Sequence, residues 1–519
     1  MAPHFSAQRV SLIFGGLFVF FITFAFTFND SLRNHVLPGR PHTSKSKSSS
    51  QLNSETKLHV LLPASRGAVD MCKTLLTGAI LGYPTPTLIA WGGIFMEDNT
   101  LGGGSHIAKI SGVKDYLDAM DPSTDDDLIL MMDAYDIWLQ LPPEVLISRY
   151  YSMNAKANKR LATKLGQAYD KEDIRQTIIF AAGKRCAPNK LHTIACYPIP
   201  DSPLPDDTYG SNTDTVMGRN KYTSLKQRYL NSGYIIGPRR DLRKLFHRAA
   251  EKVESTPALD PWDNGSGEAN NMYRGSDQSI FSTILGEQEY QREVLRRRHL
   301  TKEERLLGKE KPTPHQIEGT IIADPLNPPY THEPGESKKG RPDEYGIGLD
   351  YFSDMGLQTV NAEEDMEFLL YNTSITEQVQ QRQHHFHGIF DCPNRIGQDL
   401  AGDILESQPP QTALTGSGHW NELPLASNLC TGTVPVMIHH NGDKNARAWQ
   451  WPMTWMQPLA RELMRDIVSK NPPVPGLKGI GGAYLPGGGY LDWQTLCPSN
   501  YEYELFRDVE PPEEAPPPA

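Results

Sequence analysis

Short apolar runs alternate with longer stretches of helical spacing from residue 57 onward, and this alternation constrains the fold more than any other feature of the chain. The runs typical of buried strands are residues 57–64, 87–91, 127–132, 177–182, 233–237 and 434–440. Helical spacing is found at residues 113–120, 143–153 and 240–253. Strands that alternate with helices predict a layered α/β fold with a mainly parallel sheet.

The N-terminal region carries one uncharged segment, residues 11–28, that contains seven phenylalanines. As a helix, these 18 residues would span about 27 Å, which matches the hydrocarbon thickness of a thin bilayer. We expect a transmembrane anchor here, after a short tail of residues 1–10. A cleaved signal peptide is the alternative, but the apolar run is longer than a usual signal core and no small-x-small cleavage site follows it.

Residues 29–56 are rich in Ser, Lys, Arg and Pro, a composition that predicts a flexible stem. The charges beside the anchor favour a cytosolic body, because one arginine precedes it and four lysines and arginines follow within residues 29–50. The catalytic interpretation below requires a lumenal body, and the sequons at Asn264 and Asn372 agree with that side. The orientation stays open between these signals.

The rest of the chain is long enough for one large domain, which we place at residues 57–460. A charged, proline-rich stretch near residues 296–342 predicts a surface insertion, and residues 461–519 predict a C-terminal extension with a disordered end. The net charge of −11 gives no reason to expect a nucleic-acid partner. Six cysteines occur without a CxxC pair, so a zinc ribbon is unsupported, and their even number fits an oxidising lumen.

Two carboxylates, Asp133 and Asp136, come directly after the apolar run at residues 127–132 and just before a proline-led helix. Ligands of open α/β sheets bind at the carboxyl ends of the strands. Carboxylates at this place can hold Mg²⁺ or Mn²⁺ and leave coordination positions free for substrate phosphates. The alternative is an ordinary strand-to-turn boundary, where aspartate is common for local reasons.

Other segments add polar groups that suit a nucleotide and a metal. A glycine run lets backbone N–H groups approach a phosphate, an imidazole can complete a metal site, and a lysine can neutralise a diphosphate. A flexible loop and a helix N-cap are the alternatives for the glycine run and for Asp277. The candidates in chain order are Gly102, Gly103, Gly104, Lys109, Asn231, Asp277, His439, Asn441, Gly442 and Lys444.

Seven segments, taken in order, resemble the lumenal glycosyltransferase domain of the collagen-modifying lysyl hydroxylases and, more distantly, the procollagen galactosyltransferases. They span roughly residues 58–444 and read GGGSHIAKI, LILMMDAYDIWLQLPPEVL, IIFAAGKRCAPN, RYLNSGYIIGPRRDL, SDQSIF, LDYFSDMGLQ and PVMIHHNGDKN. The resemblance implies a GT-A-like fold, in which a Rossmann-type mixed sheet is flanked by helices and a bound metal ion holds a UDP-sugar.

The resemblance also implies roles for the candidate residues. Asp133, Asp136 and His439 match the ligands of the metal, Mn²⁺ or Mg²⁺, and the glycine run at residues 102–104 matches the donor-binding loop. Asp277 matches a catalytic carboxylate beside the sugar. The remaining polar candidates would bind the UDP-sugar.

These observations predict a single-pass type II membrane protein of the Golgi or ER that transfers a hexose from a UDP-sugar to a hydroxyl of a protein or glycan acceptor. No His-x-Asp tripeptide occurs, so a hydroxylase iron site of that pattern is absent. Two alternatives stay open. One is an inactive sugar-binding or scaffolding protein of the same fold, and the other is a glycoside hydrolase with paired carboxylates.

Overall fold

The computed structural model describes residues 57–96, 104–216, 220–255, 275–309, 344–381, 392–410, 418–470 and 481–508. These residues belong to one compact unit, Thr56–Ala519. The expected anchor at residues 11–28, the stem at residues 29–56 and the sequon at Asn264 lie outside the described residues. In the described part of the chain, no helix is both long and apolar enough to cross a membrane.

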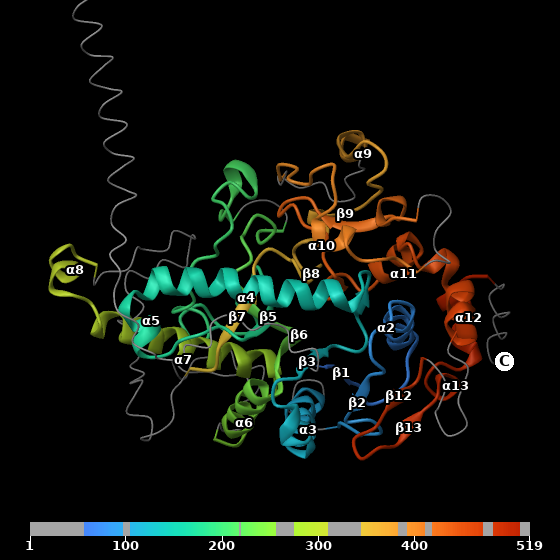
Figure 1. Ribbon diagram of the computed structural model, residues 1–519, viewed down its shortest axis with the longest axis horizontal. Coiled ribbons are helices and arrows are strands. Elements are labelled where there is room, and N and C mark those ends of the chain that lie inside the picture. The colour runs from blue at the N-terminus through green and yellow to red at the C-terminus, as the bar shows by residue number, and fades with distance from the viewer. Residues whose placement is uncertain are drawn as a thin grey trace, which may run out of the picture. The chain divides into compact units, whose positions relative to one another are not determined.

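An eight-stranded sheet forms the centre of the fold, in the order β13-β12-β2-β1-β3-β6-β5-β7 (Figure 1). The strands are β1 (Leu58–Pro63), β2 (Thr87–Ile89), β3 (Leu128–Met132), β5 (Ile178–Gly183), β6 (Tyr229–Pro238), β7 (Ile347–Asp350), β12 (Ala483–Tyr484) and β13 (Tyr490–Leu491). The sheet is mixed, because β6 is antiparallel to both β3 and β5, whereas β1 is parallel to β2 and β3. The described residues between β5 and β6 contain no α-helix, and strands joined without a crossover helix pair antiparallel.

A smaller sheet of three strands carries part of the site that is described below. Its order is β4 (Ile137–Leu139), β11 (Met437–His439) and β8 (Gly356–Gln358). The expected strand at residues 434–440 is therefore shorter than predicted and lies outside the main sheet. A two-stranded antiparallel ladder of β9 (Met366–Leu369) and β10 (Leu425–Asn428) lies between β8 and β11 in sequence.

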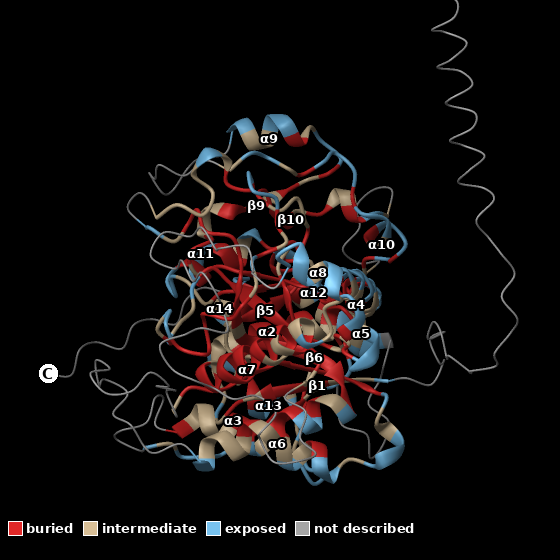
Figure 2. Cartoon of the chain, turned by 90° about the vertical axis from the view of Figure 1, so that its left-hand side faces the viewer, coloured by how far each residue is buried: buried red, intermediate tan, exposed pale blue. Residues whose placement is uncertain are grey.

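Helices cover both faces of the main sheet, as the sequence predicts (Figure 1). One layer contains α3 (Ser105–Ala119), α6 (Arg239–Ser255) and α7 (Asp277–Arg298), and the other contains α2 (Val69–Ile80) and α4 (Pro143–Leu165). Successive residues of a strand point to opposite faces. Leu61 accordingly packs in the layer of α3, and Leu62 packs in the layer of α2. Figure 2 shows the buried residues concentrated between these layers.

The observed helices extend the predicted ones, because the predicted boundaries followed only the apolar positions. The run at residues 113–120 is the second half of α3, and the run at residues 143–153 is the first half of α4. The shorter helices are α5 (Gln167–Lys171), α8 (Lys302–Leu306), α9 (Ile375–Gln381), α10 (Gly402–Leu405), α11 (Ala446–Gln450), α12 (Ala460–Lys470), α13 (Trp493–Leu496) and α14 (Glu502–Phe506).

The C-terminal part is not a separate extension. Strands β12 and β13 continue the main sheet beyond β2, and Cys497 forms a disulfide with Cys72 of α2. The expected boundary at residue 460 is therefore wrong for residues 481–508, which complete the domain. The start of the expected insertion at residues 296–342 is also ordered, because α7 continues to Arg298 and α8 follows. Residues 310–343 lie outside the described chain.

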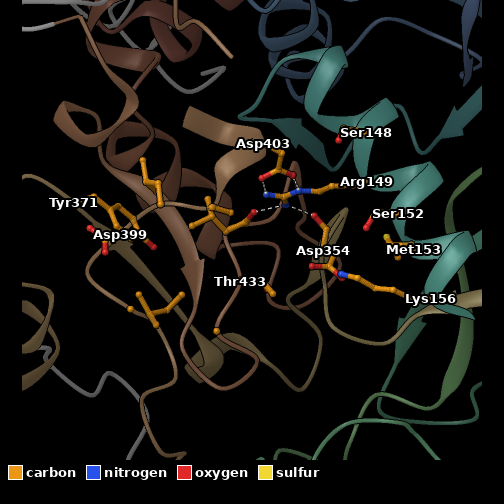
Figure 3. Close-up of a pocket in the computed structure, with 16 residues that line it drawn as sticks. Ser148, Arg149, Ser152, Met153, Lys156, Asp354, Tyr371, Asp399, Asp403 and Thr433 are labelled. Atoms are coloured by element: carbon orange, nitrogen blue, oxygen red, sulfur yellow. Dashed lines mark hydrogen bonds and ion pairs between the residues drawn. The ribbon is translucent and has the colours of Figure 1, made fainter. Parts of the chain in front are cut away.

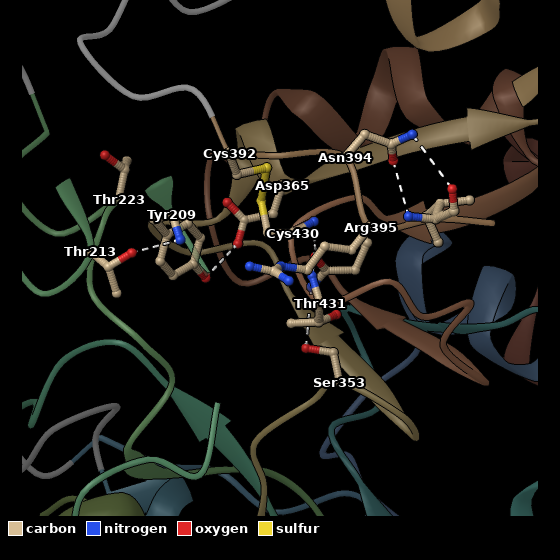
Figure 4. Close-up of a disulfide and its surroundings, with 12 residues drawn as sticks. Tyr209, Thr213, Thr223, Ser353, Asp365, Cys392, Asn394, Arg395, Cys430 and Thr431 are labelled. Atoms are coloured by element: carbon tan, nitrogen blue, oxygen red, sulfur yellow. Dashed lines mark hydrogen bonds between the residues drawn. A yellow bond between two sulfur atoms is a disulfide. The ribbon is translucent and has the colours of Figure 1, made fainter. Parts of the chain in front are cut away.

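Three disulfides pair all six cysteines: Cys72–Cys497, Cys186–Cys196 and Cys392–Cys430. Figure 4 shows the third of them beside a buried polar pair, in which the Tyr209 hydroxyl donates to Asp365 Oδ2 at 3.0 Å. Disulfides form and persist in oxidising compartments. The sequence left the pairing open, because the cysteine count alone contains no information about which chain segments meet.

Candidate functional site

The turn between β3 and β4 presents the two predicted metal-binding aspartates. Both ends of the turn are held by backbone hydrogen bonds: the Asp133 N–H donates to the Gly233 carbonyl at 2.7 Å, and the Asp136 carbonyl accepts from the His440 N–H at 2.7 Å. The turn is therefore fixed to β6 on one side and to the end of β11 on the other.

His439 reaches the same point because β11 pairs with β4 in a register that places His439 opposite Ile137. Its Nε2 lies 3.3 Å from Asp136 Oδ1 and 3.8 Å from Asp133 Oδ2. One ligand atom from each of the three residues lies within 4.8 Å of the others. The three side chains that the sequence indicated as metal ligands thus lie together. A glycine at position 233 is required for it, because a Cβ there would overlap the His439 ring.

A chain of hydrogen bonds defines which nitrogen of His439 carries the proton. The Val360 N–H donates to Asn441 Oδ1 at 3.0 Å, so the other atom of that amide is the donor Nδ2. This Nδ2 donates to Gln358 Oε1 at 2.7 Å, and His439 Nδ1 lies 2.9 Å from the same oxygen. Since Gln358 Oε1 can only accept, Nδ1 carries a proton, so the neutral tautomer of the ring has the lone pair of Nε2 directed at the aspartates.

The electrostatics of the two aspartates differ. Burial raises the pKa of Asp133, opposed by the Lys109 ammonium and reinforced by the neighbouring Asp136 carboxylate. Burial also opposes the ionisation of Asp136, but His439 and Arg447 outweigh it and lower the pKa of Asp136 to about 2. Asp136 Oδ2 accepts from Arg447 at 3.3 Å, whereas the buried Asp136 Oδ1 accepts no hydrogen bond.

The three side chains fit a divalent cation. One ligand atom from each of the three side chains can reach a common point, and the Gln358 contact holds the proton of the neutral imidazole on Nδ1, away from that point. Two carboxylates and one imidazole suit Mn²⁺, and the carboxylates suit Mg²⁺. A hydrogen bond to the second nitrogen of a histidine ligand is the usual outer support of such a site.

Lys109 does not face the cavity as a free charge, as we had expected for a group that binds phosphate. Its buried Nζ lies 2.8 Å from Asp133 Oδ1, 2.9 Å from Asp277 Oδ2 and 3.0 Å from the Ser232 carbonyl. Burial lowers the pKa of Lys109, but the two carboxylates outweigh it and raise the pKa above its ordinary value. Lys109 therefore joins the metal cluster to α7.

Asp277 is the first residue of α7, and the cap of this helix is Ser276, whose hydroxyl accepts from the Ser279 N–H at 3.3 Å. The Asp277 side chain is 4% exposed, and its Oδ1 lies 2.8 Å from His106 Nδ1. Burial opposes its ionisation, but Lys109 and His106 hold the pKa of Asp277 well below its usual range. The carboxylate is ionised, and each of its oxygens faces a cationic or donor group.

A cavity of about 570 Å³ opens over the cluster at the carboxyl ends of β1, β2 and β3. The residues of the cluster, Asn231 and Asn441 line it, as predicted, and Asn231 Nδ2 donates to Gln278 at 2.9 Å. The cavity is large enough for a small-molecule ligand. Apolar groups form part of its wall: Ile89, Ala90, Phe95, Ala187 and Pro188.

The remaining predicted residues lie elsewhere. Gly104 caps α3 with a φ of 96°, a conformation that favours glycine, while Gly102 and Gly103 lie outside the described residues. Gly442 and Lys444 are not part of the cavity wall. The Gly442 N–H donates to Thr359 at 2.9 Å, and Lys444 is exposed. These two positions follow the site in sequence, but the chain turns away after Asn441.

Three residues of the site escaped prediction from the sequence: His106, Gln358 and Arg447. Each lies within or close to a segment that was singled out, but none stands in a spacing that indicates chemistry. Arg447, for example, donates to Asp70 at 3.1 Å as well as to Asp136. Only the fold brings α2, the β3–β4 turn and α11 together.

A second polar cavity, of about 370 Å³, lies between α4 and the segments at residues 396–403 and 432–434 (Figure 3). Its most buried cation, Arg149, is fully bonded, since it donates to Asp403 at 2.6 Å and to the carbonyls of Asp354 and Val434 at 2.5 and 2.6 Å. Among the described residues, the only group suited to a metal ion is the cluster in the larger cavity. The larger cavity is therefore the candidate active site.

Comparison of the chain with known protein families and with curated proteins finds no match.

Proposed function

We propose that this protein is a glycosyltransferase that uses Mn²⁺ or Mg²⁺ to transfer a hexose from a UDP-sugar to a hydroxyl group of a protein or glycan. The observation that carries the proposal is the cluster of Asp133, Asp136 and His439, with the unbonded Asp136 Oδ1, beneath a cavity at the carboxyl ends of the central strands. Open α/β sheets bind nucleotides at these strand ends.

The chemistry of sugar transfer explains why such a cluster is useful. Cleavage of the sugar–phosphate bond leaves additional negative charge on the diphosphate, and a bound divalent cation stabilises this charge as a Lewis acid. Asp133, Asp136 and His439 would hold the cation, and Gln358 would hold the proton of the neutral His439 ring on Nδ1, which leaves Nε2 for the cation. The apolar wall formed by Ile89, Ala90 and Phe95 would accept the base of the nucleotide.

We further propose that the fold is GT-A-like and that the chain is related to the collagen-modifying glycosyltransferases which it resembles. Two features support this: a mixed sheet flanked by helices, and a second small sheet that receives the chain directly after the aspartate turn. The resemblance in seven ordered segments also supports this relationship.

We also propose that the domain works in the lumen of the ER or Golgi, anchored by residues 11–28. The three disulfides support an oxidising compartment. The sequon at Asn372 supports the same side, because Asn372 is exposed and follows β9 in a turn, where an oligosaccharide can be attached.

The proposal is tested with the full-length protein expressed in eukaryotic cells and assayed with a panel of UDP-sugars. Release of UDP should require Mn²⁺ or Mg²⁺ and stop with a chelator. An Asp136→Asn variant should lose activity on the order of 10²-fold or more, because a metal ligand is removed. Asp399→Asn, at an exposed carboxylate of the second cavity, is the matched control and should keep full activity.

Two outcomes would count against the proposal. If no UDP-sugar is turned over but one is bound, the protein is a sugar-binding or scaffolding protein. If the wild type cleaves glycosides without a nucleotide and is insensitive to chelators, it is a glycoside hydrolase.

A further inference from the structure

We propose that His106 is the general base of the transfer reaction and that Asp277 is its positioning residue. This inference rests on the proposed glycosyltransferase function, since it assigns the group that accepts the proton of the attacking hydroxyl. Asp277, which the sequence indicated as the catalytic carboxylate, would then act through His106 and not on the substrate.

The accessibility of the two side chains separates their roles. His106 lies in the first turn of α3 and lines the cavity, with 40% of its side chain exposed, whereas the Asp277 side chain is only 4% exposed. Asp277 Oδ1 lies 2.8 Å from His106 Nδ1, and Oδ2 lies 2.9 Å from Lys109 Nζ. A carboxylate that is this buried, and that these partners keep ionised, is a poor acceptor for a proton of the substrate.

The same contacts define the tautomer of His106. An ionised carboxylate is only an acceptor, so Nδ1 of His106 must carry a proton. The neutral ring therefore has its lone pair on Nε2, and this is the arrangement of a histidine that acts as a base with an aspartate behind it. The exposed part of the ring provides the substrate with access to this nitrogen.

The position of His106 relative to the metal cluster suits the reaction. Three short contacts connect them: His106 to Asp277 at 2.8 Å, Asp277 to Lys109 at 2.9 Å, and Lys109 to Asp133 at 2.8 Å. His106 and Asp133 line one cavity, so a sugar whose diphosphate is held by a cation at Asp133 would share this cavity with the imidazole and the incoming acceptor.

The charged groups that face His106 are Asp277 and Asp133, which favour its protonated form, and Lys109, which disfavours it. The hydrogen bond to Asp277 raises the pKa of His106, burial lowers it, and the result is a pKa above the ordinary value. A raised pKa makes the unprotonated ring a stronger acceptor for the proton of a hydroxyl group.

The transfer step joins the acceptor oxygen to the sugar and moves one proton to His106. The acceptor oxygen forms a bond to the anomeric carbon while the bond between that carbon and the phosphate oxygen breaks, and its electron pair leaves with the diphosphate. The hydroxyl proton moves to His106 Nε2, and the imidazolium later releases it to solvent. The products are the glycoside, UDP and one proton.

The alternative is that His106 and Asp277 only connect α3 to α7. The chain offers a matched control for this, because His247 of α6 and Asp118 of α3 form a second helix-to-helix pair at the same distance of 2.8 Å with a histidine that is 42% exposed. Neither residue lines the cavity. If the His106–Asp277 pair is purely structural, substitution of His106 should change the activity as little as substitution of His247 does.

The test compares His106→Asn with His247→Asn in the full-length protein. An asparagine amide can donate to Asp277 in place of Nδ1 but has no group at the position of Nε2. We expect His106→Asn to bind UDP and Mn²⁺ as the wild type does, measured by calorimetry, and to lose transfer by about 10²–10⁴-fold. His247→Asn should keep its activity.

The pH profile gives an independent readout. In the wild type, kcat/KM should fall as pH decreases through the pKa of His106, and this acidic limb should be absent from the residual activity of His106→Asn. The Asp277→Asn variant retains the His106 ring, but the asparagine amide oxygen is a weaker acceptor for His106 Nδ1 than the carboxylate. Transfer should therefore fall while UDP binding persists. If His106→Asn is unstable, added imidazole should restore transfer to a His106→Ala variant.

The inference and the proposed function fail in different ways. A wild type that neither binds UDP nor transfers a sugar contradicts the proposed function. A wild type that transfers, together with a folded His106→Asn variant within about threefold of its rate, contradicts only the role of His106.

Discussion

Replacing Lys109 by methionine should destabilise the protein strongly, because it leaves two carboxylates without their shared cation. Lys109 Nζ lies 2.8 Å from Asp133 and 2.9 Å from Asp277, and the side chains of Lys109 and Asp277 are 7% and 4% exposed. Breaking a buried ion pair by removing one partner costs about 3–5 kcal/mol. We expect the unfolding free energy of the metal-free Lys109→Met variant to be lower than that of the wild type by this amount.

The assay is urea unfolding followed by fluorescence and far-UV circular dichroism, in the presence of a chelator. Lys114 on the same helix provides the control, because it pairs with Asp115 and Asp118 at the surface, where an ion pair contributes about 0–1 kcal/mol. Lys114→Met should therefore be nearly neutral.

Bound Mn²⁺ should restore part of the unfolding free energy that Lys109→Met loses, because a cation at Asp133 replaces the missing ion pair between Lys109 and Asp133. Binding to the folded state alone stabilises a protein by about 2.7 kcal/mol at a metal concentration 100 times Kd. The stabilisation by Mn²⁺ should be larger in Lys109→Met than in the wild type. If Lys109→Met lowers the unfolding free energy by less than about 1 kcal/mol without metal, the stabilising role of Lys109 between Asp133 and Asp277 is refuted.

Three further predictions concern other parts of the molecule. Gln358→Leu removes the acceptor of His439 Nδ1 and should weaken Mn²⁺ binding about 10–100-fold by calorimetry, and unchanged affinity would contradict the relay. Burial, and then the neighbouring Asp354 carboxylate, raise the pKa of Asp350 to about 6, so its contribution to stability is present below its unfolded pKa and is lost as pH rises through about 6. Relative to Asp350→Asn, the wild type should lose about 2 kcal/mol of unfolding free energy between pH 4 and pH 7, and parallel pH curves would contradict this assignment. Removal of the Cys72–Cys497 disulfide should cost about 2–5 kcal/mol, measured by urea unfolding, and no change would show that the C-terminal strands are held by other contacts.

Much of the layered fold could be predicted from the sequence, because its longer strands are short apolar runs that alternate with segments of helical spacing. The strands at residues 127–132 and 177–182 lie within one residue of where they were expected. The short strands β4 and β8 could not be predicted, since three residues carry no periodic signal. The direction of β6 also depends on how the chain returns after β5 and not on its own residues.

The candidate site was predictable where its residues follow strands directly. Asp133 and His439 come at strand ends, and the register of β4 with β11 brings them together. The pairing of His106 with Asp277 was not predictable, because these residues are 171 positions apart and meet only when α3 and α7 pack on the same face of the sheet. For the same reason the sequence placed Lys109 at the phosphates and not between two aspartates.

A crystal structure of the protein with Mn²⁺ and UDP tests the central claim most directly, because anomalous scattering locates the ion. We predict one ion at about 2.0–2.3 Å from a carboxylate oxygen of Asp133 and of Asp136 and from His439 Nε2, with the diphosphate completing its coordination. An ion bound elsewhere, or UDP bound in the cavity with no ion at these three residues, would contradict it.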